Sequence, residues 1–414
     1  MKPAPTHPKD AVVRDGRHAQ PPGARAGTLR IACVTETFPP EINGVARTLA
    51  RWLSGLADRG HGIQVVRPRQ SLGDRPGRQG RFEESLHLGV PLPFYPRVRF
   101  GVPMWGALDR LWSARRPDVV YIATEGPLGQ AALNLSLRLG IPALTGFHTN
   151  FHSYCEHYRV GFLQHPVLSF LRRFHNRSRG TLVPTPEVAD RLTAHGYQNV
   201  SVLGRGVDTE QFSPSHSDPA LRTQWRLGEG GLACLYVGRL APEKNLTLAV
   251  EAFRAIEARR PGSRLILVGD GPLKGALEAQ HPDLIFPGLI ENPAAYYASA
   301  DAFLFPSESE TFGNVVLEAM ASGLAVVGYD YAAARMHIRH GESGLLARFG
   351  DRDAFIRTAE SLAEPARAAE LGDAARAEAR QVDWCRIVER FEALLVAETR
   401  RAHSAAGDEE LGLP

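Results

Sequence analysis

Short apolar runs alternate along the chain with longer segments in which apolar residues recur at helical spacing. Residues 28–38 begin with an apolar run, residues 44–61 show the helical spacing, and residues 62–68 form a second apolar run. This order predicts a strand, a helix and a strand, which is the start of a parallel βαβ unit. The same alternation continues from 117 to 149 and at 180–185.

The alternation pauses at residues 203–215, "LGRGVDTEQFSPS", where Gly, Ser and Pro gather. A second series of strands and helices begins directly afterwards. Its predicted strands lie at 232–240, 264–271, 283–288, 301–307 and 324–330, and its predicted helices at 245–259, 272–280, 293–299 and 314–322. Two such series predict an α/β fold of two doubly wound parallel sheets that face each other. Because ligands bind at the carboxyl ends of such strands, we expect a site in the cleft between two domains.

This pattern also predicts the domain boundaries. Residues 30–205 form a first Rossmann-like domain and residues 206–383 a second, while the helical stretch 384–401 is expected to pack back on the first domain. Residues 1–29 are rich in Pro, Gly, Arg and Lys and lack the apolar segment of a secretory signal. We expect a disordered tail there and a flexible tail at 402–414.

The composition is that of a globular protein. The 414 residues are too many for one core and fit two domains, and 43% hydrophobic and 22% charged residues are ordinary for a soluble chain. No apolar run reaches 18 residues, so no membrane-spanning helix is expected. The four cysteines are far apart and form no C-x-x-C pair, which favours a reduced cytoplasmic protein without disulfides or a zinc site: Cys33, Cys155, Cys234 and Cys385.

The net charge of +3 conceals an asymmetry between the two halves. Residues 1–205 contain 27 Lys and Arg against 14 Asp and Glu, whereas residues 206–414 contain 21 against 31. Basic residues stand beside bulky apolar ones at 94–117 and 162–180, which suits contact with an anionic membrane surface. Core helices with a solvated basic face would give the same pattern. No nucleic-acid-binding module is recognisable, so nucleic acid is not an expected partner.

The stretch "SESETFGNVVLEAMASG" at 307–323 follows a predicted strand and opens a predicted helix. The N-terminus of a helix has unpaired N–H groups and a partial positive charge, and Gly313 lets an anion approach the backbone, so this place suits a pyrophosphate. Glu310 could accept hydrogen bonds from sugar hydroxyls, and Glu318 from a ribose diol. Without a ligand, the two acids would be a dipole partner of the helix and a surface acid.

Three other predicted strands of the second half end in loops with matching chemistry. "VGRLAPEKN" at 237–245 places an Arg and a Lys where they could bind a diphosphate, "VGDGP" at 268–272 suits backbone contact with a base or ribose, and "PGLI" at 287–290 is similar. Four such loops in one domain predict a nucleotide site. The residues of this domain that are predicted to contact the nucleotide or its sugar, called the donor contacts below, are Gly238, Arg239, Lys244, Gly269, Asp270, Leu289, Ile290, Glu310, Thr311, Phe312, Gly313, Asn314, Val315 and Glu318.

These stretches resemble the retaining GT-B glycosyltransferases of family 4. The mark of that family is E-x7-E, here Glu310 to Glu318, and the resemblance covers about residues 30–400. In the first half, "ETFPPEINGVARTLARWL" is similar to the family's glycine loop, which implies that Gly44 lies near the donor phosphates. Many relatives have two adjacent glycines there, whereas here Asn43 precedes Gly44.

Two further segments resemble those of the family. "GFHTNF" at 146–151 is similar to the segment that carries the family's active-site histidine, here His148, and "GRGVDTEQFSP" is similar to its interdomain link. The residues of these motifs are most similar to those of a lipid-directed subgroup. That subgroup includes mannosyltransferases of MgtA type and sulfoquinovosyl-diacylglycerol synthases.

The resemblance implies retaining transfer of a hexose from a nucleoside-diphosphate sugar, with GDP-mannose favoured, to a hydroxyl of a lipid such as diacylglycerol or a glycolipid. The implied catalytic residues are His148, Glu310, Arg239 and Lys244, of which the two cations would stabilise the leaving diphosphate. No metal or other cofactor is expected. "DRD" at 351–353 fits a metal-binding D-x-D motif but is better explained as a helix N-cap. The expected location is cytoplasmic and peripheral on the inner face of the membrane.

Two other functions fit the same residues. One is a transferase that acts on a soluble sugar or a polysaccharide precursor, and the other is a non-catalytic protein that binds a sugar nucleotide. A glycan phosphorylase shares the two-domain plan but needs a cofactor lysine, which nothing here marks. The donor base and sugar, the acceptor, the linkage and the oligomeric state are left open.

Overall fold

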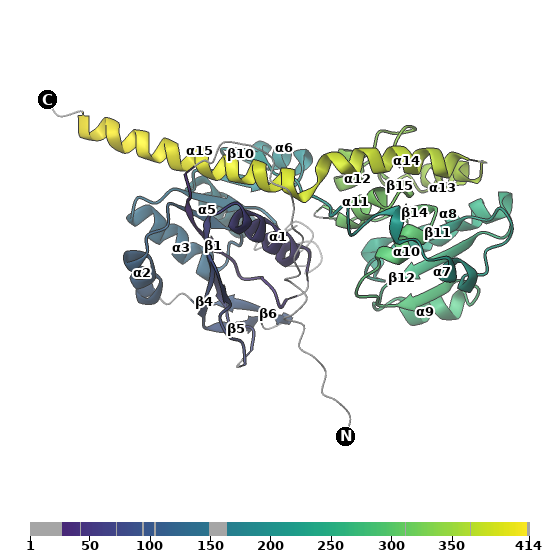
Figure 1. The fold of residues 1–414 in the computed structure, drawn as a ribbon, viewed down its shortest axis with the longest axis horizontal. Helices are drawn as coiled ribbons and strands as arrows, with labels where there is room; N and C mark the ends of the chain where they lie inside the picture. Colours follow the sequence, from purple (N-terminus) through teal and green to yellow (C-terminus); the bar gives the residue numbers. More distant parts are fainter. Residues whose placement is uncertain are drawn as a thin grey trace, which may run out of the picture. The chain divides into compact units, whose positions relative to one another are not determined.

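The computed structural model describes residues 27–41, 43–71, 73–92, 95–102, 105–148, 164–310, 312–364 and 366–411 (Figure 1). The chain divides into two compact units. The first contains residues 1–146, 177–179 and 392–414, and the second contains residues 147–176 and 180–391. Residues 1–26 of the predicted N-terminal tail lie outside the described residues.

The first sheet has eight strands in the order β10-β9-β8-β7-β1-β2-β4-β3. The strands from β8 to β4 run parallel, as do β9 and β10, and only β3 pairs antiparallel, with β4. Their bounds are β1 Arg30–Val34, β2 Gly62–Pro68, β3 Arg78–Gln79, β4 Phe82–His87, β7 Val119–Ile122, β8 Ala143–Gly146, β9 Gly180–Val183 and β10 Val200–Val202. The central strands are buried along nearly their whole length, as parallel strands covered on both faces are.

The helices of this half include the two that the periodicity predicts, within 44–61 and 117–149. They are α1 Gly44–Asp58, α2 Trp105–Ala114, α3 Pro127–Arg138, α5 Gln164–Asn176 and α6 Pro186–Ala194, and a small antiparallel sheet pairs β5 Gly89–Leu92 with β6 Tyr95–Gly101. Helix α1 buries Leu49, Trp52, Leu53 and Leu56 on one face. Its N-cap is Asn43, whose side-chain oxygen accepts the N–H of Ala46 at 2.8 Å. The asparagine that replaces a second glycine therefore anchors the start of the helix.

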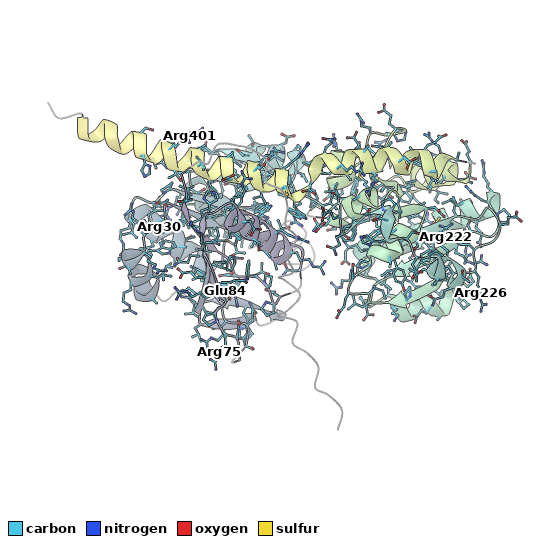
Figure 2. The ribbon with its side chains drawn as sticks, in the orientation of Figure 1. Arg30, Arg75, Glu84, Arg222, Arg226 and Arg401 are labelled. Carbon is cyan, nitrogen blue, oxygen red and sulfur yellow. The ribbon has the colours of Figure 1, made fainter. Side chains whose placement is uncertain are left out.

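A buried ion cluster stabilises the edge of the first sheet. Arg67, at the end of β2, is 2% exposed and donates to Asp74 at 2.7 Å and to Glu84 of β4, which is labelled in Figure 2, at 2.9 Å. A buried guanidinium is stable only with such partners. The cluster fixes the loop after β2 against β4.

The second sheet has six parallel strands in the order β13-β12-β11-β14-β15-β16. Their bounds are β11 Ala233–Val237, β12 Arg264–Val268, β13 Ile285–Gly288, β14 Ala302–Phe305, β15 Ala325–Tyr329 and β16 Leu345–Ala347. Their helices are α7 Pro219–Gln224, α8 Leu246–Arg259, α9 Lys274–Gln280, α10 Ala294–Ser299, α11 Asn314–Ala321, α12 Ala332–His337, α13 Arg352–Glu360 and α14 Arg367–Ala379, and short 3-10 turns are η3 Pro214–His216, η4 Pro242–Lys244, η5 Ser361–Ala363 and η6 Arg380–Val382.

Alternate residues of the second sheet enter two separate apolar clusters. Cys234 and Tyr236 of β11 pack with α8 on one face, and Ala233 and Leu235 pack with α11 on the other. Helices thus cover both faces, and the prediction of two parallel α/β sheets is confirmed. The predicted boundary between residues 205 and 206 stays a prediction; it falls between the last strand of the first sheet and the first strand of the second.

The order of the second sheet reverses between β11 and β14. From β11 the chain adds β12 and β13 on one side, and it then crosses back to add β14, β15 and β16 on the other. The loops that follow β11 and β14 therefore diverge at their carboxyl ends, which is where open α/β sheets bind ligands.

The last helix, α15, runs from Trp384 to Leu411, beyond the predicted end at 401 and into the predicted flexible tail. From Glu392 onward it belongs to the first unit. Within that unit, Glu392 accepts a hydrogen bond from Arg59 at 2.6 Å and from His61 Nε2 at 2.7 Å. The Nδ1 atom of His61 accepts the N–H of Leu29, so Nε2 carries the proton. In the described part of the chain, no helix combines the length and apolar character that crossing a bilayer requires.

Glu36, just after β1, is a buried carboxyl group that the sequence did not single out. It is 5% exposed, and its Oε1 accepts the N–H of Leu128 at 3.2 Å, in the first turn of α3. A Cβ on Gly126 would lie 1.9 Å from the other carboxyl oxygen. Burial raises the pKa of Glu36 to about 7, Glu125 adds to the rise, and the hydrogen bonds from Leu128 and Gly101 oppose it.

We expect the stability of the wild-type protein to fall as the pH rises from about 4.5 to about 7. Over that range the unfolded chain releases the proton of Glu36 while the folded chain keeps it, a difference of up to about 3 kcal/mol. In Glu36→Gln this part of the fall should be absent. Thermal unfolding at about pH 5 and about pH 8 measures it, with the exposed Glu229→Gln as the control. Equal pH dependence in wild type and Glu36→Gln would contradict the assignment.

Gly269, after β12, packs directly against the backbone after β11. Its φ is +143°, and a Cβ there would lie 1.9 Å from the carbonyl oxygen of Gly238. We expect Gly269→Ala to lower the free energy of unfolding by about 2–3 kcal/mol. Gly275→Ala is the matched control, because that site in α9 has open space and alanine favours a helix by about 0.4–1 kcal/mol. Denaturant unfolding of both variants tests this; similar stabilities would contradict the close contact.

Candidate functional site

Four predicted site residues lie on the loops and helix at the switch point of the second sheet. Arg239 and Lys244 follow β11, Glu310 follows β14, and Glu318 lies one turn inside α11. All belong to the second unit. The loop residue Thr311 lies outside the described residues.

Lys244 and Glu310, which the sequence assigned to different parts of a donor, form an ion pair with each other. The Nζ atom of Lys244 contacts Glu310 Oε1, and it also lies 3.3 Å from the carbonyl oxygen of Ser309. The hydroxyl of Ser307 donates to the same Glu310 oxygen at 3.0 Å. Both charged side chains are mostly buried, at 17% and 15% exposure. The pair fixes the loop after β14 to the 3-10 turn η4.

Arg239 supplies a second cation of different character. It is exposed, and its guanidinium makes no hydrogen bond or ion pair with a residue that the structure describes. Its carbonyl oxygen accepts the hydroxyl of Tyr236 at 3.1 Å, which holds the backbone at the strand end. The side chain is therefore available to an anion, whereas Lys244 is already paired.

Helix α11 begins without a side-chain cap. Gly313 is the N-cap residue with φ +94°, and no side chain caps the helix. Asn314 and Val315 follow in the first turn, and the carbonyl oxygen of Phe312 accepts the N–H of Ala333 at 2.8 Å. This arrangement holds the backbone of the loop while it leaves the first turn without a side-chain acceptor, as an anion site requires.

Glu318 is half-buried rather than a surface acid. Its Oε2 accepts the hydroxyl of Tyr297 in α10 at 3.0 Å. Burial, and then the neighbouring carboxylate of Glu318, raise the pKa of Tyr297 well above its ordinary value, so the phenol keeps its proton and donates. This bond orients the second acid of the E-x7-E pair.

The glycine loops and the "PGLI" segment surround this edge. Asp270 is exposed and accepts the N–H of Gly271 at 2.8 Å within its own turn. Leu289 is 77% exposed, while Ile290 packs partly against the core. These residues present backbone and one bare apolar side chain to solvent.

His148 follows β8 and is 6% exposed. Burial, with smaller contributions from Arg205 and His175, lowers its pKa to about 3, so the imidazole is neutral at physiological pH. The rest of the "GFHTNF" segment, residues 149–151, lies outside the described residues. Gly44 opens α1 in the first unit.

Arg205 was not among the predicted site residues. Its Nη1 donates to Asn314 Oδ1 at 3.4 Å, and its guanidinium carbon lies 5.6 Å from the centroid of the Phe312 ring. An arginine between two glycines in "GRGVD" was the sequence signal for it. The resemblance predicts only an interdomain link for that segment.

Asp351 of the "DRD" motif caps a helix, as predicted. Its Oδ1 accepts the N–H of Ala354 at 2.9 Å, and α13 begins at the next residue. Among the residues that the structure describes, no three His, Cys, Asp or Glu side chains gather in a way that could hold a metal ion.

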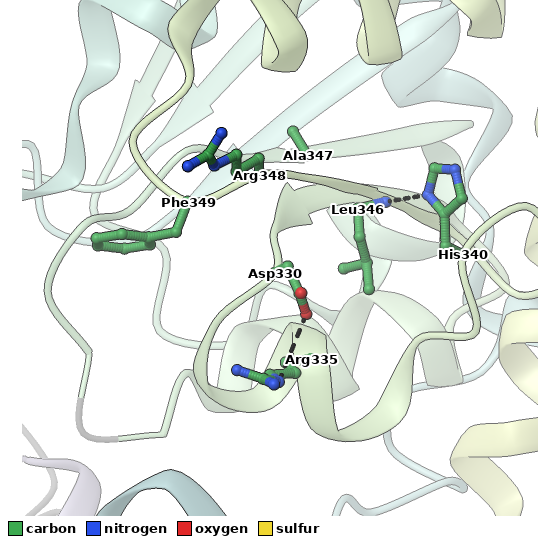
Figure 3. A pocket seen from close by; sticks show the side chains of 7 residues that line it. All are labelled: Asp330, Arg335, His340, Leu346, Ala347, Arg348 and Phe349. Carbon is green, nitrogen blue, oxygen red and sulfur yellow. Dashed lines mark hydrogen bonds and ion pairs between the residues drawn. The ribbon is translucent and has the colours of Figure 1, made fainter.

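A pocket of about 530 Å³ opens at the ends of β15 and β16 (Figure 3). Its lining residues are Asp330, Arg335, His340, Leu346, Ala347, Arg348 and Phe349. None of the predicted donor contacts lines it. Tyr331 connects it to the site, because its hydroxyl donates to the carbonyl oxygen of Glu310 at 3.0 Å and its ring lies 5.0 Å from that of Phe349.

Comparison with known proteins gives the family. The model "Glycosyltransferase Family 4" matches residues 42–211, and "Glycosyl transferases group 1" matches residues 231–364. A GDP-mannose-dependent alpha-mannosyltransferase of Mycolicibacterium smegmatis is 34% identical over 77% of this chain and 84% of that protein. The sulfoquinovosyl transferase SQD2 of Arabidopsis thaliana is 30% identical over 86% and 71%, and an alpha-monoglucosyldiacylglycerol synthase of Streptococcus pneumoniae 26% over 73% and 71%.

The fold is shared with solved structures at lower identity. Sucrose-phosphate synthase from Thermosynechococcus elongatus matches with a TM-score of 0.70 and 18% identity, over 91% of this chain and 100% of that chain. This likeness shows the two-sheet architecture, and the relatives confirm the resemblance seen in the motifs. The chain belongs to the group 1 glycosyltransferases of family 4, a retaining family with the GT-B fold.

Proposed function

We propose that this glycosyltransferase transfers mannose from GDP-mannose to a hydroxyl of a lipid acceptor. The observation that carries the proposal is the convergence of Arg239, the paired Lys244 and Glu310, and the uncapped N-terminus of α11 at one switch point. The name of the M. smegmatis relative supports GDP-mannose as the donor. The name of the monoglucosyldiacylglycerol synthase supports a lipid acceptor.

The proposed chemistry is departure of GDP with stabilisation of the charge that grows on its phosphates. Arg239 and the first turn of α11 would supply donors to the diphosphate, which is electrostatic catalysis. Lys244 would do the same while Glu310 holds it in place and accepts from the sugar hydroxyls. Glu318, oriented by Tyr297, would accept from the ribose. Because the chain itself supplies this positive charge, the proposal needs no metal ion.

His148 would act as a neutral group beside the donor sugar. A neutral imidazole can hydrogen-bond a sugar hydroxyl without adding a charge that repels the positive charge at the anomeric carbon. In a retaining transfer of this kind, the acceptor oxygen attacks on the face from which GDP departs. The acceptor proton then passes to the departing diphosphate oxygen.

A surface for the lipid is present on the β5–β6 hairpin. Val90 and Phe100 are cross-strand partners on one face of the hairpin, with side chains 48% and 39% exposed. Leu88, two residues before Val90, is 60% exposed. Arg75 and Arg78, in the segment between β2 and β4 that precedes the hairpin in the chain, are also exposed. Exposed apolar side chains with basic neighbours suit an anionic bilayer surface. We propose that this hairpin places the first unit on the membrane.

A thermal-shift panel of GDP, UDP and ADP tests the donor. We expect a selective shift with GDP that is lost in Arg239→Ala and Glu318→Ala and kept in the exposed Glu229→Ala. A ligand at about 100 times its dissociation constant stabilises the folded state by about 2.7 kcal/mol. A companion assay follows mannose transfer to lipid by NMR of the product anomer. A selective shift with UDP would show that the donor is a UDP sugar and not GDP-mannose. Binding without any transfer would favour a non-catalytic role.

Vesicle flotation tests the acceptor side. We expect the protein to float with vesicles that contain anionic phospholipid, and Val90→Asp to reduce the bound fraction several-fold. Leu137→Asp is the matched control, since Leu137 in α3 is also exposed, at 45%, but stands apart from the basic hairpin. Wild-type protein that stays with the soluble fraction, and transfers mannose only to soluble glycans, would overturn the lipid acceptor.

A further inference from the structure

Arg205 is held rigidly against the helix that opens the proposed phosphate site. It is 5% exposed and lies between two glycines whose backbone is closely packed. A Cβ on Gly204 would lie 3.0 Å from the methyl carbon of Met336, and one on Gly206 would lie 2.9 Å from the Cα of Trp384. The backbone of the "GRG" segment therefore has little room to move, and the arginine side chain leaves it in one direction.

That direction leads to the start of α11. The guanidinium contacts Asn314 at 3.4 Å and the Phe312 ring at 5.6 Å, and these two residues flank the N-cap Gly313. A helix N-terminus carries a partial positive charge, and the guanidinium of Arg205 adds a full positive charge beside it. After burial, which is the main cause, the same cation contributes to the lowered pKa of His148. A guanidinium and an uncapped helix N-terminus, both of which can donate hydrogen bonds to an anion, therefore meet at this point.

We infer that Arg205 contacts the leaving diphosphate of the sugar nucleotide, as a further catalytic residue beside Arg239 and Lys244. The inference rests on the proposed function, because it assigns a residue to the same donor site. A planar guanidinium can donate two parallel N–H groups to phosphate oxygens, which a lysine cannot do. Its contact with Phe312 and Asn314 presets the orientation, so little side-chain freedom is lost when the donor binds.

The experiment compares the diphosphate with its nucleoside in wild type, Arg205→Gln and Arg205→Lys. Isothermal titration gives the affinities for GDP and guanosine, and for UDP and uridine, so that the result does not depend on the donor base. We expect Arg205→Gln to bind the nucleoside diphosphate about 10- to 100-fold more weakly and the nucleoside unchanged, with Arg205→Lys in between. Mannose transfer should fall at least as much. Arg222→Gln is the control, because Arg222, labelled in Figure 2, pairs in the same unit with Asp301, which precedes β14, whereas the site lies beyond the other end of that strand.

The ratio of the two affinities separates contact from a structural role. If Arg205→Gln weakens nucleoside and nucleoside diphosphate equally, or neither, Arg205 does not contact the diphosphate and the inference is wrong. Should Arg205→Gln fail to fold, Arg205→Lys decides, since an unchanged ratio there overturns the inference and a reduced one supports it. Wild-type protein that binds no nucleoside diphosphate would overturn the proposed function itself. If wild type transfers mannose and Arg205→Gln transfers it equally well, the assignment of Arg205 is wrong and the proposed function stands.

Discussion

The close approach of the two backbones that follow β11 and β12 fixes the part of the site from which Arg239 and Lys244 extend. The N–H of Gly238 donates to Val268, the N–H of Leu240 donates to Asp270, and Gly269 leaves no room for a Cβ against Gly238. The parallel ladder of β11 and β12 thus continues past the strands into the loops that follow them. Arg239 projects from this joined backbone, and Lys244 follows at its far end. A backbone fixed in this way needs little reorganisation when an anion arrives.

The charges at this edge are balanced unevenly before any donor binds. Lys244 is neutralised by Glu310, Arg239 faces solvent, and Arg205 lies beside the uncapped N-terminus of α11. The pair keeps the loop after β14 in place, while the exposed guanidinium of Arg239 stays available to a diphosphate. A diphosphate would complete the balance, and its departure after transfer would restore the starting imbalance.

Periodicity predicted the strands and helices well because each central strand is buried on both faces and each helix packs one apolar stripe. The same reasoning could not pair Lys244 with Glu310, which are 66 positions apart and meet only when β11 and β14 become neighbours. It marked Asn43 only as a departure from the two adjacent glycines of many relatives, whereas the side chain caps α1. Glu36 and Arg205 escaped notice for a related reason: a single charged residue in a loop says nothing of its burial until the fold surrounds it.

The return of α15 to the first unit has a consequence for how the chain is made. The first unit contains both ends of the sequence, with the second unit inserted between them, and Glu392 is needed by Arg59 and His61 near the beginning. During synthesis, all of β11 to β16 leaves the ribosome before that glutamate does. The second unit can therefore fold on the nascent chain, while the first unit is completed only after the part of α15 from Glu392 onward has been synthesised.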